Sequence, residues 1–118
     1  LDISHWVVVH ESLLYNKKEF LKKIIQRSNH IHARVGFEEG PQINDPSAPE
    51  WENVIERHLD IWEAVIQKIW NENKSATITT EFGPPGYMPT LPFTQKPISD
   101  QWKANVFIMD KLKRRIKE

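Results

Sequence analysis

The sequence predicts an α/β fold in which parallel strands alternate with helices, and three observations predict it. A strand end, a polar loop and an amphipathic helix follow one another three times along the chain. The clearest apolar stripe has the 3.6-residue period of a helix, and short segments rich in β-branched residues separate the helical stretches. Right-handed crossovers place the carboxyl ends of parallel strands on one face of such a fold.

The first repeat begins with the opening segment, which we expect to be a strand end carrying Asp2 and His5. A helix is predicted next, with Asn16 as its N-cap and Glu19 as the capping-box partner three residues later. The apolar residues that follow fall on one helical face: Phe20, Leu21, Ile24 and Ile25.

The second repeat begins with a short strand within residues 30–36, where Ile31 and Val35 are β-branched. Residues 37–48 are rich in Gly, Pro, Asn and Asp, which predicts an irregular loop. A long helix then opens at Pro49, because proline is tolerated in a first helical turn. Its stripe, including the tryptophans, is predicted to pack in the core: Trp51, Val54, Ile55, Leu59, Trp62, Val65, Ile66 and Ile69.

The third repeat begins with a strand over residues 76–82, in which threonines alternate with Ile78 and which ends in Glu81. Residues 83–97 contain five prolines and two glycines, so they form neither a helix nor a central strand. Ser99 is predicted to cap a last helix with a third apolar stripe: Trp102, Val106, Met109, Leu112 and Ile116.

Composition sets limits on the class of protein. The 118 residues are enough for one domain, which we assign to residues 1–118. Lys plus Arg and Asp plus Glu each number 16, which argues against a nucleic-acid partner. The absence of cysteine excludes disulfides and thiolate sites. No apolar run is long enough for a bilayer and no signal peptide opens the chain, so we expect a cytoplasmic protein without a membrane partner. Because the chain begins at Leu1 without Met, we expect a fragment or a processed product.

Acids and histidines stand at the three expected strand ends. Asp2 and His5 belong to the first, His30 and His32 share one side of the second, and Glu81 ends the third. Oxygen and imidazole ligands together suit Mn, Co, Fe, Zn or Mg. Each acid alone is more simply explained without a metal, since a single acid near a strand end is usually a helix cap or a solvated charge. Their order on consecutive strand ends favours a divalent metal site.

Three motifs carry a resemblance to a known family: Asp-Ile-Ser-His at 2–5, His-Ile-His-Ala-Arg-Val-Gly at 30–36 and Thr-Thr-Glu-Phe-Gly-Pro-Pro at 79–85. In this order they resemble the xylose-isomerase-like TIM-barrel superfamily, which includes sugar phosphate isomerases and epimerases. The resemblance implies a partial (β/α)8 barrel, roughly its last three strand–helix units. The barrel would be completed by a missing N-terminal half or by a homo-oligomer.

The resemblance also implies a reaction and its residues. Asp2, His32 and Glu81 correspond to the ligands of a divalent metal such as Mn, Co, Mg or Zn, and Glu81 also to an acid–base carboxylate. His5 corresponds to a histidine that contacts a substrate hydroxyl, and it is the second catalytic candidate. The reaction implied is isomerisation or epimerisation of a small-molecule sugar or sugar phosphate, by proton transfer through an enediolate.

Two departures from the family pattern bear on activity. The family often has an arginine a few residues after the ligand histidine, where this chain has Glu38; Arg34 is the candidate substitute for binding substrate. The family's second acid–base glutamate stands upstream of the Asp motif, and this chain does not supply it. We therefore expect the chain alone to be inactive.

Two other functions remain open from the sequence. The first is a metal-dependent phosphodiesterase or abasic-site endonuclease on the same barrel, which needs more His and acidic ligands and usually a basic face. The second is a non-enzymatic half-barrel that acts as an interaction module. The balanced charge argues against the first, and the retention of Asp2, His32 and Glu81 argues against the second.

Overall fold

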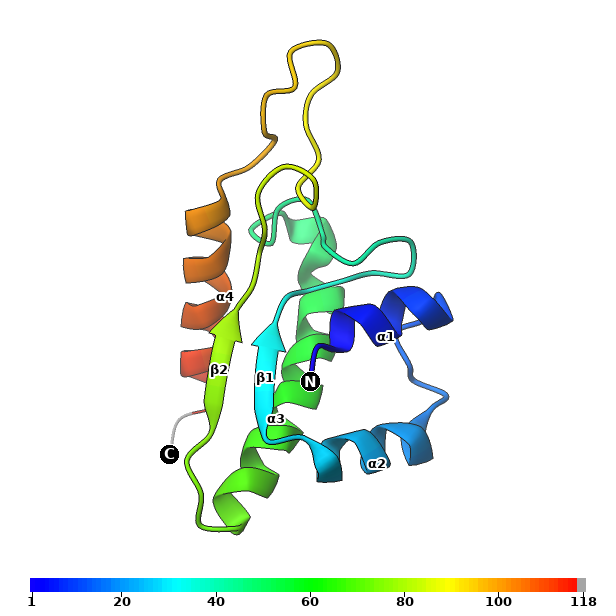
Figure 1. The fold of residues 1–118 in the computed structure, drawn as a ribbon, viewed down its shortest axis with the longest axis vertical. Coiled ribbons are helices and arrows are strands. Elements are labelled where there is room, and N and C mark those ends of the chain that lie inside the picture. The colour runs from blue at the N-terminus through cyan, green and yellow to red at the C-terminus, as the bar shows by residue number, and fades with distance from the viewer. Residues whose placement is uncertain (117–118) are drawn as a thin grey trace.

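Four α-helices and two short parallel strands form the fold of this computed structural model, which describes residues 1–116 (Figure 1). In chain order the elements are α1 (Ile3–His10), α2 (Lys18–Arg27), β1 (His30–Ala33), a 3-10 turn η1 (Pro49–Trp51), α3 (Glu52–Asn71), β2 (Thr77–Thr80) and α4 (Gln101–Arg115). Within the described residues no helix has both the length and the apolar content needed to cross a membrane.

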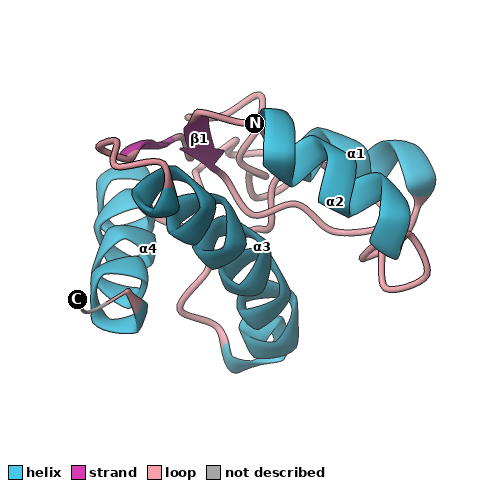
Figure 2. Cartoon of the chain, turned by 90° about the horizontal axis from the view of Figure 1, so that it is seen from below, coloured by secondary structure: helices cyan, strands magenta, loops and turns pink. Residues whose placement is uncertain are grey.

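The sheet consists of β1 and β2, which run parallel and are connected through α3 (Figure 1). His32 pairs with Thr79 and Ala33 with Thr80, so the two carboxyl ends lie level with each other. Helices α3 and α4 pack against one side of the strands, and no described helix covers the other side (Figure 2). The parallel α/β arrangement predicted from the sequence is therefore observed.

The prediction of a partial (β/α)8 barrel with three strand–helix units is wrong. Only two strands form among residues 1–116, and the expected first strand end is occupied by α1. Asp2 is the N-cap of this helix, because its side chain accepts a hydrogen bond from the Ser4 amide. Leu1 alone pairs with β1: its amine donates to the carbonyl oxygen of His30 at 2.7 Å, and the His32 amide donates to its carbonyl oxygen at 2.8 Å.

The hydrophobic core lies between the sheet and α3. Ile31 and Ala33 of β1 are fully buried, whereas His30 and His32 alternate with them toward the uncovered side. The long helix begins close to the predicted start at Pro49, after the 3-10 turn η1, and its apolar face fills the core as predicted: Ile55, Leu59, Trp62, Val65, Ile66 and Ile69. Trp51 and Trp70 are partly buried against this cluster.

Two helix starts and one helix face differ from the sequence prediction. α2 begins after Lys17 rather than Asn16, and no side chain caps it. α4 is capped by Asp100, whose carboxylate accepts from the Lys103 amide, while Ser99 donates instead to the carbonyl oxygen of Asn44. Trp102 is 77% exposed although its spacing placed it on the apolar stripe, because the buried face of α4 is formed by Ala104, Ile108 and Leu112.

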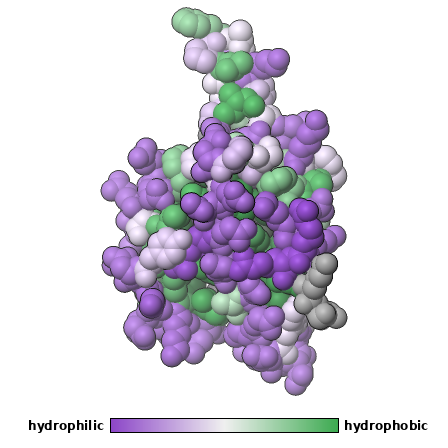
Figure 3. Space-filling view, turned by 180° about the vertical axis from the view of Figure 1, so that it is seen from behind, coloured by the Kyte–Doolittle hydropathy of each residue, from purple (hydrophilic) through white to green (hydrophobic). Residues whose placement is uncertain are grey.

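Residues 84–98 form a projecting loop that extends the molecule along its longest axis (Figure 1). It is neither helix nor strand, as the prolines predicted, but its two arms are joined by backbone hydrogen bonds, including one from the Leu91 amide to the carbonyl oxygen of Lys96 at 2.7 Å. Phe93 is fully exposed near its tip and has a left-handed backbone, with φ at 67°. Hydrophobic surface is visible on this projection in Figure 3.

Arg115 joins the end of α4 to α3. Its guanidinium contacts three carboxylates one turn apart on α3, those of Glu56, Asp60 and Glu63, and the hydrogen bond to Asp60 is the main reason that the pKa of Arg115 is raised. We expect Arg115→Ala to lower the free energy of unfolding by about 1 kcal/mol, because exposed ion pairs contribute little singly and more as a network. Urea unfolding measures the loss, which should shrink at high salt. A loss that does not depend on salt would contradict an electrostatic link.

Candidate metal centre

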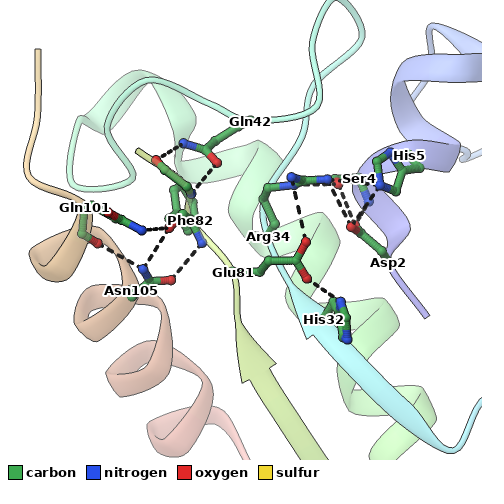
Figure 4. Close-up of polar contacts among 11 residues, drawn as sticks. Asp2, Ser4, His5, His32, Arg34, Gln42, Glu81, Phe82, Gln101 and Asn105 are labelled. Atoms are coloured by element: carbon green, nitrogen blue, oxygen red, sulfur yellow. Dashed lines mark hydrogen bonds and ion pairs between the residues drawn. The ribbon is translucent and has the colours of Figure 1, made fainter. Parts of the chain in front are cut away.

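Three segments that are distant in the sequence meet at the carboxyl ends of the strands. The parallel register brings Glu81, one residue beyond β2, next to the end of β1. The pairing of Leu1 with β1 places Asp2 on the other side of the same strand. His32 lies on β1 between the two carboxylates (Figure 4). Backbone pairing therefore determines which side chains face one another.

Asp2, His32 and Glu81 each offer a ligand atom, and the three atoms lie within 4.8 Å of one another. A divalent ion about 2.1 Å from each ligand atom would hold those atoms at most about 4.2 Å apart. The three side chains thus need to close by less than about 1 Å to share one ion. They are the residues that the sequence motifs indicated, and the structure brings all three together.

One atom of Glu81 lacks a hydrogen bond. Glu81 Oε2 is buried and accepts no hydrogen bond from residues 1–116, and its close partner is His32 Nδ1, with which it forms an ion pair when the imidazole is protonated. A buried carboxylate oxygen that accepts no hydrogen bond is costly, and a cation bound by both Glu81 and His32 would remove that cost. Two carboxylates and one imidazole are a donor set suited to Mn, Co, Fe, Zn or Mg. The residues present therefore fit a divalent metal.

Asp2 is held from several sides. Its Oδ1 accepts hydrogen bonds from the amide and the hydroxyl of Ser4, and its Oδ2 accepts one from Arg34 Nη2 at 3.1 Å. Ser4 is fully buried and packs on Gly36, where an added Cβ would come within 2.8 Å of the Ser4 Cβ. Glycine at position 36 thus permits the close approach that fixes the start of α1 beside β1.

Arg34 lies between the two carboxylates (Figure 4). Its side chain is only 3% exposed; Nε donates to Ser4 Oγ at 3.2 Å, and Nη1 lies 3.8 Å from Glu81 Oε1. The guanidinium also stacks on the Tyr87 ring, 4.9 Å from its centroid. A buried arginine with these neighbours is suited to orient Asp2 and Glu81 and to balance their charge.

His5 lies at the rim of the site. Its imidazole is 60% exposed, with Nε2 located 3.3 Å from Asp2 Oδ2 and 3.1 Å from Arg34 Nη2. Arginine can only donate, so neutral His5 accepts at Nε2, whereas protonated His5 donates to Asp2. The exposed ring is within reach of a ligand that enters from solvent.

The segment after Glu81 is fixed by three side-chain amides. Gln42 donates to the carbonyl oxygen of Gly83 at 3.2 Å and accepts from its amide at 2.8 Å. Asn105 accepts from the Phe82 amide at 2.8 Å, and both Asn105 and Gln101 donate to the Phe82 carbonyl oxygen at 3.0 Å (Figure 4). These bonds hold the backbone on which Glu81 stands.

Two histidines near the site have other partners. His30 contacts the hydroxyls of Thr77 and Thr79 through its two ring nitrogens, at 2.7 and 3.2 Å. His58 is buried under β1; its Nδ1 donates to the Val54 carbonyl oxygen and its Nε2 accepts from the Gly36 amide. Burial is the main cause that lowers the pKa of His58 to about 4, so this ring is neutral near pH 7.

The sequence alone assigned no role to Ser4 or His58 in this region, whereas the loop that contains Tyr87 was expected to form a wall of the site because it follows Glu81. For Arg34 a signal was present, because residues 30, 32 and 34 alternate onto one side of a strand. For Tyr87 and His58 no spacing rule applied, since their contacts depend on how the projecting loop and α3 pack.

Comparison of the chain with protein-family models, with curated proteins and with solved structures finds no significant match to any of them. The features that bear on function are therefore the order of the three motifs and the geometry of Asp2, His32 and Glu81.

Proposed function

We propose that this chain carries the metal-binding part of a divalent-metal-dependent isomerase or epimerase acting on a sugar or sugar phosphate. The observation that supports it is the convergence of Asp2, His32 and Glu81 within 4.8 Å from three separate segments. Three protein ligands leave coordination positions for oxygens of a substrate, as in catalytic rather than structural metal sites. When bound, the ion would polarise a carbonyl and stabilise the negative charge of an enediolate.

The residues of the chain have distinct roles in this proposal. Glu81 Oε1 is the atom available to exchange a proton with a carbon next to the carbonyl, because the Glu81 side chain is 34% exposed whereas its Oε2 is buried. His5 reaches outward to a substrate hydroxyl. Arg34 holds both carboxylates in place and was the candidate for binding substrate; its 3% exposure favours the holding role.

The first test is a titration with Mn²⁺, in which electron paramagnetic resonance measures how much of the ion is bound. We expect one Mn²⁺ per chain and a rise in the thermal midpoint through mass action. Glu81→Gln should weaken binding at least about tenfold, since even residues that only orient ligands contribute this much. Glu39→Gln, in an exposed loop position, is the matched control. Equal Mn²⁺ affinity in the wild type and Glu81→Gln would rule out the proposed ligand set.

A second measurement addresses the substrate class. A polyol with hydroxyls on adjacent carbons, such as ribitol, should displace water from bound Mn²⁺ and lower the water proton relaxation rate. A diol whose hydroxyls are far apart should not, because it cannot offer two oxygens to one ion. No effect of ribitol in a chain that binds Mn²⁺ would contradict the sugar assignment while leaving the metal site intact.

The alternatives are less well supported by the site. A phosphodiesterase that uses several zinc ions needs ligands beyond Asp2, His32 and Glu81, and His30 is already bound to two threonine hydroxyls. An interaction module does not require a buried carboxylate oxygen without a hydrogen bond, as Glu81 Oε2 is.

A further inference from the structure

A groove of about 470 Å³ lies between α2 and α3, away from the residues of the metal centre. It falls within the range of about 300–1,000 Å³ that small-molecule sites occupy. Eight residues line it: Tyr15, Lys18, Leu21, Lys22, Ile25, Gln26, Arg57 and Lys68. None of these is a ligand or a neighbour of the metal centre described above.

The floor of the groove is apolar. Leu21 is buried and Ile25 is half-buried, one helical turn apart on α2. Tyr15 stands at one end, with its ring exposed on one side and covered on the other by the guanidinium of Arg57, 4.4 Å from the ring centroid. An apolar floor with one aromatic wall favours a ligand that has a hydrocarbon body.

The rim of the groove is positively charged. Lys18 and Lys22 are exposed and lie one turn apart on α2, and within residues 1–116 no carboxylate lies within 4.0 Å of either ammonium. Arg57 donates to the carbonyl oxygens of Leu13 and Leu14 at 2.9 and 3.1 Å, which fixes its orientation without neutralising its charge.

Lys68, the fourth cation, is partly balanced by Glu72 at 3.5 Å. None of the lining residues is acidic. A chain whose formal net charge is zero thus gathers three uncompensated cations around one apolar groove. Such a charge distribution complements a single anionic group.

We propose that this groove binds a small organic anion with an apolar body, as a second site independent of the metal centre. The anionic group lies between Lys18, Lys22 and Arg57. The hydrocarbon body lies along Leu21 and Ile25. A carboxylate or a phosphate monoester supplies the same charge, and the ligand class is defined by the combination of that group with an alkyl or aromatic chain.

The test is a titration of the full chain with decanoate. Calorimetry measures the affinity, and amide chemical shifts show which residues are affected. We expect saturable binding, with the largest shifts on α2 between Lys18 and Gln26, and weaker binding at high salt. A second titration uses decyl phosphate in place of decanoate. The ligand that binds with higher affinity shows whether the groove prefers a phosphate or a carboxylate head group.

Lys18→Gln combined with Lys22→Gln should weaken decanoate binding about fivefold, because each exposed ion pair contributes a factor of a few. Lys23→Gln, on the same helix but outside the groove, should leave affinity unchanged. Both variants should retain the wild-type melting midpoint, since all three lysines are exposed. Metal binding should also be unaffected, which separates this proposal from the proposed isomerase function.

Three outcomes would overturn the proposal. The first is the absence of saturable decanoate binding by the folded chain. The second is equal affinity for decanol, which would show that charge contributes nothing. The third is self-association of the chain that the double lysine variant abolishes, which would mean that a second copy occupies the groove.

Discussion

Replacing Arg34 by methionine is expected to lower the free energy of unfolding of the metal-free chain by about 3 kcal/mol. The substitution keeps the aliphatic volume under Tyr87 but removes the charge that lies between Asp2 and Glu81. Losing one partner of a buried ion pair costs about 3–5 kcal/mol. We expect the lower end of that range, because the side chains of Asp2 and Glu81 remain 13% and 34% exposed.

The effect of Mn²⁺ tests whether Arg34 acts by balancing the charge of the metal ligands. A divalent ion on Asp2, His32 and Glu81 would restore part of the positive charge that Arg34→Met removes. The thermal midpoint should therefore fall by about 10 °C without metal, and Mn²⁺ should raise it more in the variant than in the wild type. Arg34→Lys should lower the thermal midpoint by less than Arg34→Met, because the ammonium keeps the positive charge although it lacks the planar geometry of a guanidinium.

Arg27→Met, at the exposed end of α2, is the control for loss of an arginine charge as such. If Mn²⁺ raised the midpoint of Arg34→Met and of the wild type by equal amounts, Arg34 would not act on the metal ligands. Its role would then be limited to packing beneath Tyr87.

The second large effect is a loss of stability on acidification that comes from His58. Burial lowers the pKa of His58 to about 4 in the folded chain, below its ordinary value of 6.5. The unfolded chain therefore binds more protons between these two values, and stability falls as the pH falls through 6.5 toward 4. Above pH 6.5 the contribution of His58 is fully present.

Between about pH 7.5 and about pH 5 this histidine should account for a loss of about 2 kcal/mol in the free energy of unfolding. Urea unfolding at a series of pH values measures it. His58→Gln should be less stable at neutral pH, because the Val54 carbonyl oxygen loses the Nδ1 donor, but its pH dependence in this window should be shallower. His10→Gln, whose ring is not buried, should keep the wild-type slope. A wild-type slope in His58→Gln would contradict the assignment.

The elements predicted with a strong period are the ones that the structure contains. The stripe from Trp51 to Ile69 indicated α3 because a 20-residue helix must bury one face whatever its neighbours are. The alternation in residues 30–36 and 76–82 likewise indicated β1 and β2, although both strands are only four residues long.

The structure of the opening segment could not be predicted from a periodic pattern. Asp2 followed by Ser4 suits either a strand end with an active-site acid or a helix N-cap, and the structure shows that Asp2 is an N-cap beside the other site residues. Local sequence does not decide between these because the choice depends on the pairing of Leu1 with β1, which joins residues 29 positions apart in the chain.

The positions of Asp2, His32 and Glu81 could be predicted from motif order, but the residues that hold them could not. Arg34 and Ser4 act through contacts between α1 and β1, and Asn105 acts from α4 on the segment after Glu81. Strand alternation indicated that Arg34 lies on the side of the site, but its contacts form between elements, so no period or cap signal indicated that it holds Asp2 and Glu81.

The level pairing of β1 and β2 has a consequence for folding. The two paired strands are separated by more than forty residues, so their register is established only after a long loop has closed, which is slow compared with helix formation. Until then Glu81 and His32 belong to independent parts of the chain. A slip of one residue would turn the Glu81 carboxylate to the opposite side of the sheet. Cation binding would thus distinguish correctly registered chains from compact misfolded ones, and it would develop late in refolding, after the helical signal is complete.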